Sequence, residues 1–173
     1  MANAGIAGNQ LLRIPALVLF GYPVPARLVR DVLIQSGARV VILLEGINDI
    51  GASSTKAEDL IPTDLQIIRS VHAARMKIFG ATLLPFGGSN AQYGGDYGTP
   101  AGDAQRQALN EWIRTSGAFD GVIDFDKAVR DPADPKRLFP AFDSGDHLHP
   151  NEVGYWVMAN TVDLDAIILA ALR

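Results

Sequence analysis

Residues 143–149 hold the groups in this chain that are best suited to acid–base chemistry. Two aspartates and two histidines lie within this short segment, although the whole chain has only 3 histidines. Asp146 precedes His149 by three positions. A carboxylate so placed can hold an imidazole in one tautomer and stabilise its charged form, as the Asp of a Ser-His-Asp system does. The segment therefore predicts a general base, His149, oriented by Asp146.

A metal site is the alternative interpretation of the same segment. His147 could join His149 and either Asp143 or Asp146 as ligands. The chain has no cysteine, however, and its remaining histidine, His72, is far away in the sequence. Protein zinc sites take three or four such side chains. We therefore expect no metal site here.

Two further segments carry donors that could stabilise an oxyanion. Residues 3–9 contain Gly5 and Gly8, and glycine lets a backbone bring its N–H groups close to a ligand. Residues 46–49 read Gly-Ile-Asn-Asp, and the amide of Asn48 is a donor of the same kind. The plainer alternatives are a flexible terminus for residues 3–9 and a turn cap at residues 48 and 49.

The elements that must position these groups follow an alternating order. Short apolar runs bounded by Gly, Pro or polar residues predict strands, and apolar stripes between them predict helices. The expected strands are residues 40–44, 76–84 and 121–125, with a fourth at residues 16–20. The expected helices are residues 26–35, 57–75 with a break at Pro62, 101–115 and 151–172. This order predicts one α/β domain, residues 1–173, with a parallel sheet, whose carboxyl ends form the functional edge.

One long loop separates two of these elements. Residues 87–100 contain five glycines, and irregular loops of this length are often functional or mobile. Phe86, Tyr93 and Tyr97 lie in or beside it. They could form an apolar wall for an acyl or aryl group, or they could simply fix the loop.

Composition excludes several classes of function. The 173 residues are 48% hydrophobic and 20% charged, with a net charge of −4, which disfavours nucleic acid as a partner. No apolar run reaches the roughly 20 residues that span a bilayer. The first residues lack the basic and apolar regions of a signal peptide. As written, the chain is expected to be cytoplasmic, although full-length relatives could be secreted.

These segments together resemble the SGNH (GDSL-type) hydrolase family of esterases and lipases. That family has a flavodoxin-like three-layer fold and four short sequence blocks. The resemblance places Gly8 and Asn48 as oxyanion donors, His149 as the base and Asp146 as its orienting acid. It covers the chain from residue 3 to the C-terminus, less securely over residues 13–27. It implies hydrolysis of a small carboxylic ester with a short acyl, aryl or acetylated-sugar group, without a cofactor.

The family's first block, Gly-Asp-Ser, has no counterpart in this sequence, so the nucleophilic serine and the strand before it are missing. Ser89, Ser53 and Ser144 are the substitute nucleophiles that we consider, although none lies in a Gly-x-Ser-x-Gly elbow. Three explanations remain open: a truncated or mis-started chain, a rebuilt fold completed by residues 16–20 or by another chain, and a non-catalytic binding domain. A gap in the sheet would favour a homo-oligomer or a complementing chain.

Overall fold

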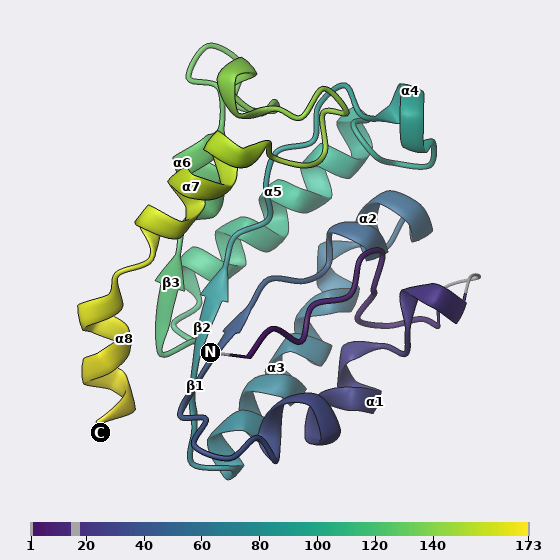
Figure 1. Cartoon of the computed structure of the whole chain (residues 1–173). Coiled ribbons are helices and arrows are strands. Elements are labelled where there is room, and N and C mark those ends of the chain that lie inside the picture. The colour runs from purple at the N-terminus through teal and green to yellow at the C-terminus, as the bar shows by residue number, and fades with distance from the viewer. Residues whose placement is uncertain (1, 15–17, 173) are drawn as a thin grey trace.

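Three parallel strands form the central sheet of the protein (Figure 1). The computed structural model describes residues 2–14 and 18–172. The sheet has the order β1 (Val40–Leu43), β2 (Lys77–Ala81) and β3 (Gly121–Ile123). Val41 pairs with Ile78, and Gly80 pairs with Val122. The three main predicted strands and the parallel α/β architecture are confirmed.

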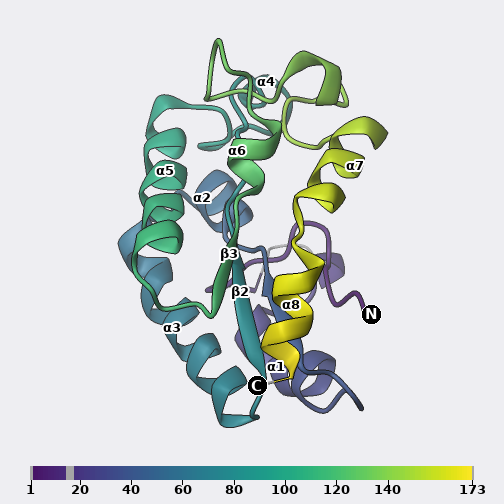
Figure 2. The same cartoon turned by 90° about the vertical axis from the view of Figure 1, so that its left-hand side faces the viewer.

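Helices cover both faces of this sheet and make three layers (Figure 2). One face carries α3 (Ala57–Ala73) and α5 (Pro100–Thr115), and the other carries α7 (Glu152–Thr161) and α8 (Leu164–Ala171). Neighbouring side chains of a strand point to opposite faces. Ile78 accordingly belongs to the core with Leu109 of α5, whereas Phe79 belongs to the core with Met158 of α7.

The apolar run after β2 makes one more backbone hydrogen bond to β3, from the Thr82 N–H to the Ile123 carbonyl at 3.1 Å, and then leaves the sheet. The Leu83 N–H donates to Asn110 Oδ1 at 2.7 Å, and the Leu83 carbonyl accepts from Asn110 Nδ2 at 2.8 Å. A side chain of α5 therefore satisfies backbone groups that a strand would otherwise pair. This explains why β2 ends at Ala81, earlier than its hydrophobic pattern predicts.

The predicted fourth strand, residues 16–20, is wrong for the part of it that the structure describes. Val18–Phe20 form a short 3-10 helix, η1, and positions 16 and 17 lie outside the described residues. Leu19 is 71% exposed there. The carbonyl of Phe20 accepts from the Asn9 side chain at 2.7 Å instead of from a strand. This segment is therefore built around Asn9 and does not extend the sheet where it is described.

Several helices differ from their predicted bounds. The helix expected at residues 26–35 is α1 (Val24–Leu28) followed by a π-helical segment, η2 (Val29–Leu33). Helix α3 continues through Pro62 without the expected break. Pro62 and Glu58 are exposed, so water can reach the Glu58 carbonyl that loses its helical N–H partner. The remaining elements are α2 (Ile47–Ser53), α4 (Asn90–Tyr93), α6 (Phe125–Val129) and η3 (Pro140–Phe142).

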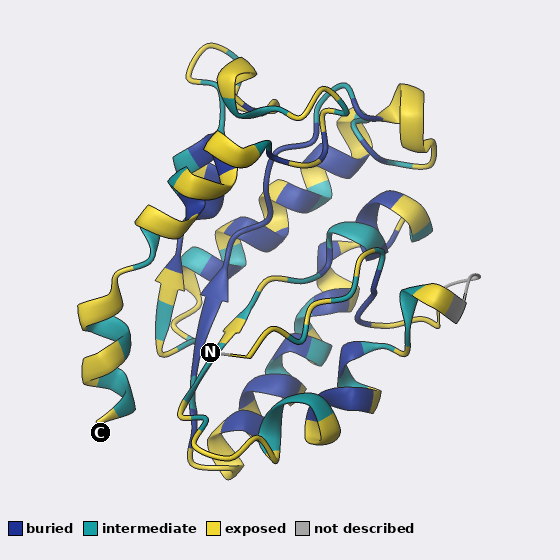
Figure 3. Ribbon diagram, viewed as in Figure 1, coloured by how far each residue is buried: buried dark blue, intermediate teal, exposed yellow. Residues whose placement is uncertain are grey.

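The closing helix is two helices rather than one. Asn151 caps α7 as predicted, because its side chain accepts from the Gly154 N–H. Asp163 caps α8 in the same way through the Ala166 N–H. No single helix of the described residues is long and apolar enough to cross a bilayer. The pair α7 and α8 reaches that length and apolarity, with a bend of 49° between the two helices. Their outer faces are largely exposed (Figure 3).

A buried ionic network ties α5 to α6. Arg106 is 2% exposed and donates to Asp126 at 2.6 Å and to Asp103 at 2.7 Å. Arg114 also donates to Asp126, at 2.7 Å. Each buried charge thus has a partner, which its burial requires. The network holds the chain after β3 against the helix that covers the sheet.

Two buried carboxyl groups lie near the end of β1 and lack such a partner. Glu45 Oε1 and Asp64 Oδ1 are inaccessible to solvent and have no hydrogen-bond partner among the described residues. Burial, with repulsion from nearby Asp49, raises the pKa of Glu45 to about 8 and that of Asp64 to about 7. Both groups therefore hold a proton well above the pH at which an exposed carboxyl loses it.

We expect the free energy of unfolding to fall as pH rises from about 5 to about 9. The folded chain keeps protons that the unfolded chain releases near pH 4. Raising the pH within this window therefore stabilises the unfolded chain relative to the folded one. Between pH 6 and pH 9, the free energy of unfolding of a Glu45→Gln variant should fall by roughly 2 kcal/mol less than that of the parent. Urea unfolding at both pH values measures this, with the exposed Glu111→Gln as control. Equal pH dependence in the parent and Glu45→Gln would contradict it.

Candidate active site

Three of the segments that carry predicted site groups lie beyond the carboxyl ends of the three strands (Figure 1). Asn48 follows β1 at the start of α2, the glycine-rich loop follows β2, and residues 143–149 follow β3 and α6. Parallel strands bring their carboxyl ends to one edge of a sheet, and ligands bind at that edge in open α/β folds. The positions of these segments agree with the predicted functional edge.

His149 and Asp146 form a hydrogen-bonded pair. His149 Nδ1 lies 2.7 Å from Asp146 Oδ2. Asp146 Oδ1 accepts from the backbone N–H groups of Leu148 and His149 at 2.9 and 2.8 Å. Partial burial alone would raise the pKa of Asp146, but these hydrogen bonds outweigh it and hold that pKa well below its usual range. The carboxylate is therefore ionised at neutral pH and can orient the imidazole, leaving Nε2 free to act.

His147 makes a second pair of this kind with Asp143. Its Nδ1 lies 2.5 Å from Asp143 Oδ2, and its backbone has a φ of +63°, a strained value for a non-glycine residue. The two pairs use different carboxylates. Within the described residues, no group of three His, Cys, Asp or Glu side chains could hold a metal ion. The segment thus presents two separate His–Asp pairs.

The Asn48 amide is held in one orientation by two hydrogen bonds. Nδ2 donates to the Asn9 carbonyl at 2.9 Å, and Oδ1 accepts from the Tyr97 hydroxyl at 2.7 Å. The second N–H of Nδ2 has no acceptor among the described residues. An oriented N–H without an acceptor is the group that an oxyanion site needs.

Gly8 lies next to Asn9, the partner of Asn48, in a chain segment pinned to α2. Its φ is +72°, and a Cβ there would lie 2.4 Å from the Phe20 ring, so only glycine fits. The N–H groups of Leu11 and Leu12 donate to Asp49 at 2.8 and 3.0 Å. These bonds fix the segment beside Asn48. The Gly8 N–H itself makes no hydrogen bond within the described residues.

None of the three serine hydroxyls that we considered hydrogen-bonds to the His149 ring in the described structure. Ser89 is fully buried, and its hydroxyl donates to the Phe86 carbonyl at 2.6 Å. Ser53 exchanges hydrogen bonds with the Gln10 side chain. Ser144 is exposed, and its backbone N–H donates to the His149 carbonyl. Their hydroxyl groups are thus engaged elsewhere or face solvent.

Sequence reasoning missed the polar roles of Tyr93 and Tyr97. The Tyr93 hydroxyl donates to Asp146 Oδ2 at 2.9 Å, and its ring lies 6.0 Å from the His149 ring, edge to face. The Tyr97 hydroxyl binds Asn48, as described above. Their position in a glycine-rich loop beyond β2 was the available signal. It could not reveal which groups the hydroxyls would reach.

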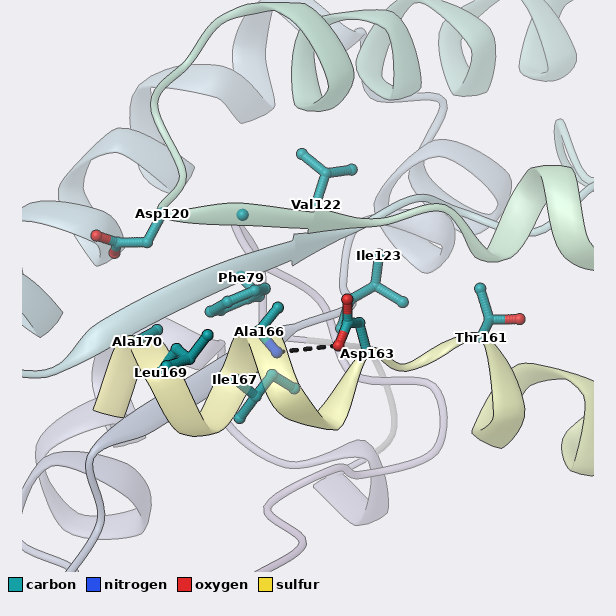
Figure 4. Close-up of a pocket in the computed structure, with 11 residues that line it drawn as sticks. Phe79, Asp120, Val122, Ile123, Thr161, Asp163, Ala166, Ile167, Leu169 and Ala170 are labelled. Carbon is teal, nitrogen blue, oxygen red and sulfur yellow. Dashed lines mark hydrogen bonds between the residues drawn. The ribbon is translucent and has the colours of Figure 1, made fainter. Parts of the chain in front are cut away.

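Two cavities of the structure lie away from His149. One, of about 410 Å³, lies between α8 and the start of β3 (Figure 4). Phe79, Val122 and Ile167 line it. The other, of about 350 Å³, borders the ionic network around Arg106. His149, Asp146 and Asn48 line neither cavity.

Residues 1–157 match the model of the GDSL-like Lipase/Acylhydrolase family. A comparison with curated proteins finds no significant match. Among solved structures, a GDSL-like lipase from Bacteroides thetaiotaomicron VPI-5482 superposes with a TM-score of 0.72 at 20% identity, over 95% of this chain and 74% of that one.

Two further structures show the same fold. A putative acylhydrolase from Bacteroides fragilis NCTC 9343 has a TM-score of 0.65 at 22% identity, over 84% of this chain and 68% of that one. An acetyl xylan esterase has a TM-score of 0.63 at 19% identity, over 91% of this chain and 76% of that one. The family match spans most of the sequence, and these neighbours share its architecture. The chain therefore belongs to the GDSL-like lipase/acylhydrolase family.

Proposed function

We propose that this chain carries the base and the oxyanion donors of a carboxylic-ester hydrolase. The observation that carries the proposal is the pair formed by His149 and ionised Asp146 at the edge of the sheet where Asn48 also lies. This combination supports acyl transfer more directly than any other reaction class.

The proposed mechanism assigns one task to each group. His149 Nε2 takes the proton of an attacking hydroxyl, and Asp146 stabilises the resulting imidazolium. The carbonyl oxygen of the ester becomes an oxyanion and accepts hydrogen bonds from the N–H groups of Asn48 and Gly8. His149 then returns the proton to the departing alkoxide, and the acyl group stays on the attacking oxygen. If that oxygen belongs to a serine, His149 next takes a proton from a water molecule that attacks the acyl carbon, and returns it to the serine oxygen as the acid leaves. Short acyl, aryl or acetylated-sugar esters are the proposed substrates, which is in keeping with the acetyl xylan esterase among the structural neighbours.

For the attack itself, none of the serines that we considered is positioned to give its proton to His149 in the described part of the chain. The hydroxyls of Ser53, Ser89 and Ser144 make no hydrogen bond to the His149 ring in the described structure. This observation favours a second candidate function, a non-catalytic binding domain that keeps the esterase fold. A complementing chain or a homo-oligomer that brings a serine to Nε2 is the corresponding proposal for an active form.

Replacing His149 by Ala should lower p-nitrophenyl acetate hydrolysis by about 10²–10⁴-fold, because the general base is lost. The matched control is His147→Ala. It removes a neighbouring imidazole with its own aspartate, so the rate should stay within about threefold of the parent if His147 takes no part in the chemistry. Equal rates in the parent and His149→Ala would refute the assigned base. A parent without activity would favour the binding domain.

A fluorophosphonate should leave Ser89 unlabelled, because this hydroxyl is buried and bonded to a carbonyl. Mass spectrometry of the intact chain and its peptides identifies any modified residue. Labelling of Ser53 or Ser144 that disappears in His149→Ala would place that serine at Nε2. Labelling of Ser89 would contradict the structure around Phe86.

A further inference from the structure

We propose that Tyr93 and Tyr97 are positioning residues that hold the base and the oxyanion donor of the site in a fixed relation. The inference rests on the proposed roles of His149 and Asn48, and it assigns a task to the glycine-rich loop that carries both tyrosines. Each tyrosine hydroxyl binds one half of the site, and the two rings contact each other.

Tyr97 determines which way the Asn48 amide points. Its hydroxyl donates to Asn48 Oδ1 at 2.7 Å, while the Asn9 carbonyl accepts from Nδ2 on the other side. A rotated amide would set its oxygen against the Asn9 carbonyl oxygen and would lose the hydrogen bond that Oδ1 accepts from Tyr97. Burial raises the pKa of Tyr97 to about 12, so the hydroxyl remains a donor at any physiological pH. The second N–H of Asn48 is thereby aimed in one direction.

Tyr93 completes the set of donors around the Asp146 carboxylate. Oδ1 accepts two backbone N–H groups, and Oδ2 accepts from the Tyr93 hydroxyl at 2.9 Å and binds His149 Nδ1. A carboxylate held by four donors cannot rotate without breaking several of them. The Tyr93 ring also meets the His149 ring at an interplanar angle of 70°. Both contacts restrict the imidazole.

The loop that supplies these tyrosines is itself anchored on α2. The Asp96 N–H donates to the Gly51 carbonyl at 2.8 Å. The Tyr97 ring packs so closely on Gly51 that a Cβ there would lie 2.2 Å from a ring carbon. Because Asn48 lies in the first turn of the same helix, α2 is a common support for Asn48 and Tyr97. From Tyr97 the contact continues to Tyr93, with ring centroids 5.7 Å apart, and then to His149.

Because the two hydroxyl groups bind different halves of the site, removing each one should have a different effect. In Tyr97→Phe, the Asn48 amide loses the partner of Oδ1 and gains rotational freedom. In Tyr93→Phe, Asp146 and His149 lose one restraint while Asn48 keeps its own. Each change retains the ring and its packing, so the fold is maintained. A purely structural role would alter neither the Asn48 amide nor the His149 ring selectively.

NMR on the ¹⁵N-labelled full chain tests this directly. Tyr97→Phe should shift the Asn48 side-chain NH₂ signals and speed their exchange with solvent at least fivefold, and leave the His149 Nδ1 proton signal in place. Tyr93→Phe should broaden or remove that Nδ1 signal and leave the Asn48 signals in place. The control is Tyr155→Phe, on the exposed face of α7, where the hydroxyl makes no hydrogen bond within the described residues. It should change neither signal.

Ester hydrolysis by the same variants gives a second readout. Each of Tyr93→Phe and Tyr97→Phe should lower kcat about tenfold with KM changed less than twofold, because positioning acts on the transition state. Unchanged Asn48 and His149 signals in both variants would overturn the proposal. If the chain shows the selective NMR changes but has no esterase activity, the positioning role stands and the proposed function fails. The two proposals can therefore be tested separately.

Discussion

The parallel pairing of β1, β2 and β3 is the constraint on which the rest of the structure depends. It makes the segments that follow the three strands leave the sheet at one edge, although they are far apart in the sequence. Asn48, the two tyrosines and the His149–Asp146 pair each come from one of these segments. The N-terminal residues lie outside the sheet and join this edge through Asp49, which accepts the N–H groups of Leu11 and Leu12.

The parts of the site that are set by local geometry could be predicted from the sequence. The spacing of Asp146 and His149 allows the hydrogen bond between their side chains, and Asn48 directly follows the turn after an apolar strand. The strands and their parallel order were also predictable, since short apolar runs alternate with amphipathic helices. The implied burial on both faces holds for β2, whereas Ile42 of β1 and Val122 of β3 are exposed. These features depend on short stretches of chain, which is why one sequence was enough.

Contacts between distant segments could not be predicted. The apolar run at residues 16–20 looked like a strand, but its described part folds around Asn9, and hydrophobicity does not encode that partner. The end of β2 is set by Asn110, a polar residue on a helix more than twenty positions away. The roles of Tyr93 and Tyr97 depend on where a glycine-rich loop meets Gly51 of α2. In each case the local structure depends on a contact with a residue that is distant in the sequence.

We propose that Asn48, Gly8 and His149 form one site that stabilises a tetrahedral oxyanion. Titration of the ¹⁵N-labelled chain with a tetrahedral arylboronate anion tests it most directly, because binding does not require a serine nucleophile. We predict that the largest shifts occur at the Asn48 side-chain amide, the Gly8 N–H and the His149 ring. Shifts confined to the cavity between α8 and β3, with Asn48 and Gly8 unchanged, would contradict the claim.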